Sequence, residues 1–184
     1  MAVDYQSLWD SMTINNEHEV INAAKEILKN QTRYMNVVEG TLIPWQFIGA
    51  THYREADCDF TCHPHNGDSL KQRTVDVPAG RPISGNPPFT WEESAKDCYI
   101  TLKQLDKVPE WDLVTILSHF EAFNGLGYQK YHPECLSPYL WSYSNHYTSG
   151  KYASDGKFDP NLIDKQVGCA AIYKYLTDKT LGLV

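Results

Sequence analysis

The chain has 184 residues and a formal net charge of −7, with 42% hydrophobic and 21% charged residues. This length favours one domain with a sizeable core, and the composition is that of a globular rather than a disordered protein. The acidic balance argues against a nucleic-acid-binding protein, which normally carries a basic face. The unusual feature is the aromatic content of 5 Trp, 12 Tyr and 6 Phe. We expect some of these rings to line a surface groove.

No apolar run is long enough to cross a bilayer, so no membrane insertion is expected. The first twenty residues contain Asp4 and Glu17 and lack the apolar stretch of a secretory signal. We therefore expect synthesis in a cytoplasm, and a monomer. The sequence is compatible both with buried thiols and with disulfides for the five irregularly spaced cysteines. These are Cys58, Cys62, Cys98, Cys135 and Cys169.

Helical signals dominate the first third of the chain. Asn16, followed three residues later by Glu19, predicts a helix start, and apolar residues at helical spacing extend that helix to about Tyr34. Pro44 predicts the start of a second helix, which ends near Asp57.

The pattern then changes. Residues 60–88 are rich in Pro and Gly and contain the alternating segment 73–77, which predicts a loop with a short β-hairpin. Further helices are expected from a capping box at 90–93, over 111–123, and from the Asp-Pro pair at 159–160 to about residue 176. The expected fold is a mainly α (α+β) single domain over 1–184, with a small β-hairpin insertion after the second helix.

Glu55 is the first candidate catalytic residue. It lies at the end of the second helix, directly before the Gly- and Pro-rich insertion. Partial desolvation and the negative end of the helix dipole both favour a protonated carboxyl, which suits a general acid. A solvated Glu paired with Arg54 or Lys71 is the alternative.

Glycoside hydrolysis also needs a second group across the sugar. Asp68 follows Glu55 by 13 residues in an Asn-Gly turn, and Thr74 comes six residues later. We expect Asp68 and Thr74 together to position a water or to stabilise positive charge. Asp76 is the reserve choice for the second acid, and Asp57 and Asp59 are further rivals.

Two motifs resemble the lysozyme superfamily. Residues 50–60, Ala-Thr-His-Tyr-Arg-Glu-Ala-Asp-Cys-Asp-Phe, resemble the segment around the acid Glu of goose-type lysozymes and soluble lytic transglycosylases, although Ala56 stands where those families usually have Ser. The interval from Asp68 to Thr74 is similar to that in the Glu, Asp, Thr triad of tailed-phage lysozymes. Residues 121–128, Glu-Ala-Phe-Asn-Gly-Leu-Gly-Tyr, resemble the Ala-Tyr-Asn-x-Gly motif of lytic transglycosylases.

The resemblance implies a lysozyme-like fold and a muramidase. Such an enzyme hydrolyses the β-1,4 bond between N-acetylmuramic acid and N-acetylglucosamine of peptidoglycan, without a cofactor or metal. It also implies sugar contacts from Asn124, Gly125 and Tyr128. With no signal peptide and no separate wall-binding module, the chain looks like a phage-type endolysin that reaches the cell wall after release.

The aromatic stretch after Tyr128 extends this candidate sugar site. Aromatic rings interleaved with Ser, Asn and His suit the apolar faces and polar edges of pyranose rings. We expect Trp141, Tyr143 and Tyr147 to bind substrate. Packing of these rings beneath a long loop is the alternative.

Other functions stay open at this point. A lytic transglycosylase would use Glu55 alone and yield an anhydro sugar. A zinc-dependent amidase could use the residue types grouped at Asp57, Cys58, Cys62, His63 and His65. A cysteine-dependent amidase could use Cys58 or Cys62 with a distant histidine, namely His119, His132 or His146. A non-catalytic glycan-binding module would keep only the aromatic groove.

Overall fold

The computed structural model describes residues 3–154, 156–180 and 182. Helices make up most of the regular structure, and a two-stranded antiparallel sheet is the only sheet in these residues. The expected mainly helical class with a small β-hairpin is therefore confirmed. Within the same residues, no helix combines the length and the apolar character needed to cross a bilayer.

The chain divides into two compact units. Unit 1 comprises Met1–Lys25 and Asp112–Val184, and unit 2 comprises Glu26–Trp111. The boundary falls inside helix α2 (Glu17–Lys29). A single catalytic domain over the whole chain stays a prediction.

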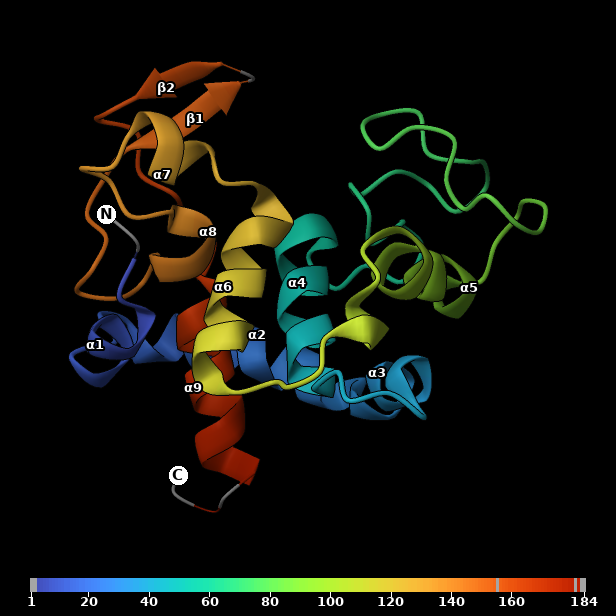
Figure 1. Ribbon diagram of the computed structural model, residues 1–184, viewed down its shortest axis with the longest axis horizontal. Coiled ribbons are helices and arrows are strands. Elements are labelled where there is room, and N and C mark those ends of the chain that lie inside the picture. Colours follow the sequence, from blue (N-terminus) through green and yellow to red (C-terminus); the bar gives the residue numbers. More distant parts are fainter. Residues whose placement is uncertain (1–2, 155, 181, 183–184) are drawn as a thin grey trace. The chain divides into compact units, whose positions relative to one another are not determined.

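Unit 1 is built around packed helices. Helix α6 contacts both α1 and α8, and α8 packs against α9 (Figure 1). Its largest fully buried side chains are Leu117, Phe120, Leu140, Trp141, Ile172 and Leu176. The elements of this unit, besides the first part of α2, are α1 (Tyr5–Asp10), α6 (Leu113–Asn124), α7 (Gly127–Tyr131), α8 (Pro138–Trp141), β1 (Lys151–Ser154), β2 (Lys157–Asp159) and α9 (Cys169–Thr180).

Unit 2 packs α3 against α4 and α5 against η1. Gly49 in α4 lets this helix approach α2 closely, because a Cβ there would collide with the side chain of Ile27. Fully buried side chains of the unit include Tyr34, Phe47, Ile48, Trp91 and Tyr99. Its elements, besides the last part of α2, are α3 (Gln31–Val38), α4 (Trp45–Ala56), α5 (Trp91–Lys96), the π-helix η1 (Asp97–Leu102) and the 3₁₀ helix η2 (Leu105–Lys107).

Local capping chemistry explains the helix boundaries that were predicted well. Helix α4 starts directly after Pro44 and ends before Asp57, as expected. The capping box of α5 is present, with Thr90 and Glu93 bonded reciprocally. Helix α6 begins after Asp112, whose carboxylate accepts from the Thr115 N–H at 2.7 Å.

Other boundaries were wrong. The helix expected from Asn16 to about Tyr34 is two helices, α2 and α3, separated at Asn30. The last helix begins at Cys169 rather than at Asp159. The Asp159 carboxylate instead accepts from the N–H of Asn161 at 2.8 Å, which makes a turn at the end of β2.

The position of the β-hairpin was also wrong. Residues 73–77 form no strand, and the hairpin is β1–β2, with Tyr152 opposite Phe158 (Figure 1). The N–H groups of Val75 and Asp76 donate to the Asp68 carboxylate instead of to a neighbouring strand. Near them, the side chain of Val77 is 89% exposed. The alternating pattern therefore marks a loop edge rather than a strand with one buried face.

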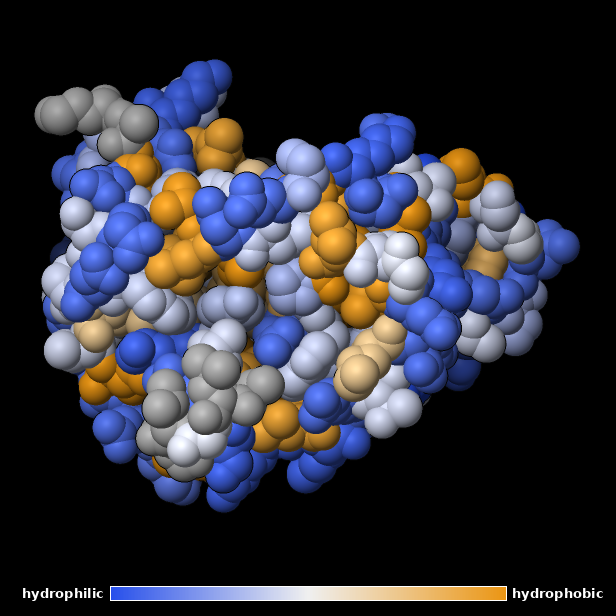
Figure 2. Space-filling view, turned by 60° about the horizontal axis from the view of Figure 1, so that its bottom comes forward, coloured by the Kyte–Doolittle hydropathy of each residue, from blue (hydrophilic) through white to orange (hydrophobic). Residues whose placement is uncertain are grey.

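The surface mixes polar and apolar side chains. Figure 2 shows orange hydrophobic groups separated by blue hydrophilic ones on the face in view. Scattered apolar residues of this kind are normal on a folded protein. The pattern on this face therefore identifies no single large binding patch.

Candidate active site

Glu55 lies in the last turn of α4 and is half-buried. The helix ends abruptly because Asp57 and Cys58 both adopt left-handed backbone conformations, with φ of 51° and 59°. Such angles are uncommon for residues other than glycine. The chain therefore turns away directly after Glu55 and leaves its side chain at the edge of the following loop.

Cys98 and Tyr99 of η1 lie close to the Glu55 carboxylate and are fully buried. Burial raises the pKa of the Cys98 thiol, and the negative charge of Glu55 adds to this effect. Burial likewise raises the pKa of Tyr99, again with a contribution from Glu55. The charge of Glu55 thus acts on both buried groups, and the charges of Lys103, Asp97 and Arg81 act on the same thiol.

The loop after α4 returns to the end of that helix. At Gly67, which has φ of +82°, a Cβ would lie only 3.0 Å from the backbone oxygen of Glu55. Glycine is therefore the residue that fits both the backbone conformation and the close approach. This contact confirms that the Asn-Gly turn before Asp68 lies near the end of the second helix.

Asp68 holds this loop together through its Oδ2 atom. That oxygen accepts hydrogen bonds from Val75 N at 2.8 Å, from Asp76 N at 3.0 Å and from Asn66 Nδ2 at 3.0 Å. Desolvation raises the pKa of Asp68, but these three hydrogen bonds outweigh it, so the pKa lies below its usual value. Asp68 is thus an ionised acceptor that shapes the loop.

Thr74 is turned into the loop and is only 4% exposed. Its hydroxyl donates to the Pro78 carbonyl at 2.5 Å and accepts from Arg81 N at 2.9 Å. The hydroxyl therefore holds the backbone of its own loop, and the expectation that Thr74 shares a water with Asp68 stays a prediction. The reserve candidate, Asp76, is exposed.

A buried polar network that the sequence analysis missed fixes the same loop to α5 and η1. Asp97, 5% exposed, accepts from Arg81 Nε at 2.8 Å and Nη2 at 3.1 Å, and its Oδ2 lies 3.0 Å from His65 Nε2. Ser94 Oγ lies 3.4 Å from His65 Nδ1 and 2.6 Å from His63 Nδ1. The capping box on Thr90 locates the helix, but no spacing pattern indicates that these partners meet.

A second buried acid was missed in unit 1. Glu121 of α6 is 1% exposed and accepts from the hydroxyl of Tyr5 at 2.6 Å. Gln129 donates to the same hydroxyl at 3.0 Å. The Tyr5 hydroxyl therefore ties α1 to α6 through Glu121 and to α7 through Gln129.

The residues expected to bind sugar differ in exposure. Asn124 and Gly125 are exposed at the end of α6, where Gly125 has φ of +96°. Their contact with sugar stays a prediction. By contrast, Trp141 is fully buried in the core of unit 1. The prediction that Trp141 contacts substrate is therefore wrong.

Three of the tyrosines that were expected to bind sugar are held by internal hydrogen bonds. Tyr128, 5% exposed, accepts at its hydroxyl from Tyr152 N at 3.3 Å. The Tyr147 hydroxyl, on a ring 7% exposed, accepts from Asp164 N at 3.0 Å. Tyr143 is half-buried, and its hydroxyl donates to a backbone carbonyl at 3.0 Å. These tyrosines therefore pack inside the aromatic segment, where their hydroxyls hold the backbone.

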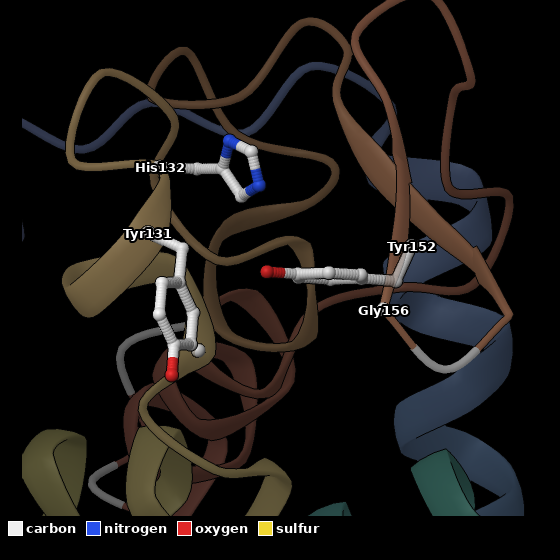
Figure 3. A pocket seen from close by; sticks show the side chains of 5 residues that line it. Tyr131, His132, Tyr152 and Gly156 are labelled. Carbon is white, nitrogen blue, oxygen red and sulfur yellow. The ribbon is translucent and has the colours of Figure 1, made fainter.

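The rings that do face an open space are different ones. A pocket of about 580 Å³ in unit 1 is lined by Gly127, Tyr131, His132, Tyr152 and Gly156 (Figure 3). Tyr131 and His132 come from the end of α7, and Tyr152 comes from β1. All three belong to the aromatic stretch, but sequence spacing did not separate rings that line a pocket from rings that fill a core.

The cysteines are free thiols. Burial raises the pKa of Cys58 to about 12, and burial also raises that of Cys62. Neutral thiols are poor nucleophiles and poor metal ligands. Across residues 3–154, 156–180 and 182, no three His, Cys, Asp or Glu side chains are grouped to hold a metal ion.

The chain was compared with known protein families, curated proteins and solved structures, and none of them matches it. The resemblance to the lysozyme superfamily therefore depends on the motifs at residues 50–60 and 121–128.

Proposed function

We propose that the chain is a glycosidase of peptidoglycan, with Glu55 as the general acid at the β-1,4 bond between N-acetylmuramic acid and N-acetylglucosamine. The observation that carries the proposal is the placement of Glu55. Its half-buried side chain lies in the last turn of α4, and its charge acts on the buried Cys98 and Tyr99. The loop that follows returns at Gly67 to the backbone of Glu55.

These surroundings suit proton donation to a leaving oxygen. The C-terminal end of a helix carries partial negative charge, and limited contact with water disfavours an ionised carboxyl. In the proposed mechanism Glu55 is protonated before the bond breaks and gives this proton to the leaving oxygen. The polar network around Asp97 keeps the neighbouring loop in place, so that Glu55 would donate its proton next to a loop of fixed conformation.

In the hydrolase form of the proposal, Asp68 assists the attack of water or the developing positive charge. No hydrogen bond falls on its Oδ1 atom among the described residues, and that oxygen would face the sugar. A lytic transglycosylase is the second candidate. The three hydrogen bonds at Oδ2 and the engaged hydroxyl of Thr74 favour a mechanism that uses Glu55 alone.

The products separate the two candidates. Mass spectrometry of digested glycan strands shows reducing ends for a hydrolase and 1,6-anhydro ends for a transglycosylase. In either case we propose a monomeric, phage-type enzyme that another protein releases onto the cell wall.

The catalytic assignment is tested by Glu55→Gln in a turbidity assay on purified cell walls. Loss of general acid catalysis is expected to slow lysis by about 10²–10⁴-fold, because the amide cannot give up a proton in the same way. The control is Glu39→Gln, the same change at an exposed residue that ends α3. It is expected to keep the wild-type rate. Wild-type lysis by Glu55→Gln, with intact circular dichroism, would refute the proposal.

A further inference from the structure

Two separate elements of unit 1 line the pocket. The end of α7 carries Tyr131 and His132, and strand β1 carries Tyr152. Figure 3 shows the three rings around one open space, with the Tyr152 hydroxyl directed towards the α7 side. The volume of about 580 Å³ falls within the usual range of small-molecule sites, about 300–1,000 Å³.

Ring contacts hold the lining in place. The His132 ring stacks on Phe158 of β2, with centroids 3.7 Å apart and an interplanar angle of 16°. Tyr152 meets Phe158 and Tyr128 edge to face, at 5.6 and 5.2 Å. Because these rings are already packed, a ligand entering the pocket would order few further side chains.

Tyr131 is the most exposed of the lining rings, at 62%. The ammonium group of Lys130 lies 4.8 Å from the centroid of this ring and restrains it. Gly127 and Gly156 add no side chain to the pocket. The site therefore offers ring surface next to open space.

The chemistry of the lining selects among ligands. Among the residues that the structure describes, no Lys, Arg, Asp or Glu lines the pocket, which argues against an ionic ligand such as phosphate. The side-chain polar groups of this described lining are the hydroxyls of Tyr131 and Tyr152 and the imidazole of His132, whose Nδ1 lies 3.3 Å from a carboxylate oxygen of Glu134. Ring faces combined with hydroxyl and imidazole groups match a pyranose, which has apolar C–H faces and hydroxyl edges.

We propose that this pocket is a saccharide subsite that binds one N-acetylhexosamine ring of a glycan strand. This inference rests on the proposed function for the identity of the glycan. The Tyr131 ring stacks on a C–H face of the sugar, and the Tyr152 hydroxyl and the imidazole of His132 hydrogen-bond to its edge. Tyr131, His132 and Tyr152 are thus binding residues, distinct from Glu55 in unit 2.

Binding of a tetramer of N-acetylglucosamine to the full chain tests the subsite by isothermal calorimetry. Tyr131→Ala is expected to weaken binding about tenfold, because it removes the stacking face. Tyr131→Phe keeps that face and is expected to stay within about threefold of wild type. The matched control is Tyr175→Ala, at a half-buried tyrosine lining another hollow of unit 1, and wild-type affinity is expected there.

A second variant narrows the pocket and leaves the rings intact. At Gly127 an added Cβ would lie 3.7 Å from the Tyr152 hydroxyl, which is ordinary van der Waals contact. Gly127→Ala is therefore expected to fold normally and to weaken binding of the tetramer. In wall digestion, Tyr131→Ala and Gly127→Ala are expected to raise KM more than they lower kcat, because the pocket binds substrate and takes no part in the proton transfer.

The outcomes separate the subsite from the catalytic assignment. Wild-type affinity in both Tyr131→Ala and Gly127→Ala, or no binding of the tetramer to the wild type, overturns the subsite whatever Glu55→Gln does. Weakened binding in these variants supports the subsite. If Glu55→Gln lyses walls normally in that case, the subsite stands and the proposed function falls.

Discussion

Two long, largely irregular segments of the chain are ordered by different forces. Residues 57–90 in unit 2 are held by hydrogen bonds from buried polar groups, with Asp68, Thr74 and Asp97 as the main acceptors. Residues 128–154 and 156–168 in unit 1 are held by packed rings, such as His132 on Phe158, and by hydrogen bonds between tyrosine hydroxyls and the backbone. The first segment thus depends on buried carboxylates and hydroxyls, whereas the second depends on aromatic side chains.

The difference shows how candidate site residues should be judged. In the polar segment, a hydroxyl or carboxylate that looks catalytic is used to hold the backbone, as Thr74 shows. In the aromatic segment, the same residue type serves two roles according to exposure. Trp141 is fully buried, whereas Tyr131 is 62% exposed.

The largest expected effect concerns the aromatic segment. Trp141→Ala is expected to lower the free energy of unfolding by about 3–5 kcal/mol, because it leaves a large cavity between α8 and its neighbours α6 and α9. Urea denaturation monitored by circular dichroism measures the change. Tyr131→Ala, at an exposed ring, is expected to cost less than about 0.5 kcal/mol. Equal losses in the two variants would contradict the division between core and pocket rings.

The next effect concerns the polar segment. Asp97→Ala is expected to cost about 3 kcal/mol, because it leaves Arg81 and His65 without their acceptor in a buried site. The control is Glu26→Gln, which removes an exposed ion pair with Lys29 and should cost less than about 1 kcal/mol. A loss below 1 kcal/mol for Asp97→Ala would show that ring packing alone orders unit 2.

The smallest effect per residue is a dependence on pH in the polar segment. Burial lowers the pKa of His52 and of His65 to about 4, from 6.5. Trp91 Nε1 donates to His52 Nε2 at 3.0 Å, which requires the neutral imidazole. Between pH 6.5 and 4 the unfolded chain binds the proton more tightly, so stability is full above pH 6.5 and falls as the pH decreases. For each histidine the loss from pH 7 to pH 5 is about 2 kcal/mol.

Urea titrations at several pH values measure this slope. His65→Gln is expected to flatten the profile, because one of the two titrating groups is gone. His18→Gln, at a side chain 78% exposed, is expected to leave the slope unchanged. An unchanged slope in His65→Gln would mean that this histidine does not couple folding to protonation.

Local signals predicted much of the helical fold. Pro44 and the capping box at Thr90 placed the starts of α4 and α5, because capping involves residues only a few positions apart. The hairpin was misplaced, because the N–H groups of Val75 and Asp76 bond to a carboxylate seven and eight residues away. Alternation alone does not show which partner a backbone N–H finds.

The candidate site was predicted in part. The placement of Glu55 at a helix end, and of the Asn-Gly turn beside it, followed from adjacent residues. The roles of Asp97 and Glu121 did not, because their partners Arg81 and Tyr5 lie 16 and 116 residues away. The pocket rings were recognised only as part of an aromatic stretch.

The sequence by itself determined the helical class, the end of α4 near Asp57 and the concentration of aromatic residues after Tyr128, since each depends on composition or on neighbouring residues. Only the tertiary structure decided that Thr74 is engaged in its loop, that Trp141 belongs to the core and that Tyr131 and Tyr152 line a pocket. The physical reason is that burial and hydrogen-bond partners depend on residues distant in sequence. The chemical type of a side chain determines neither its burial nor its hydrogen-bond partner.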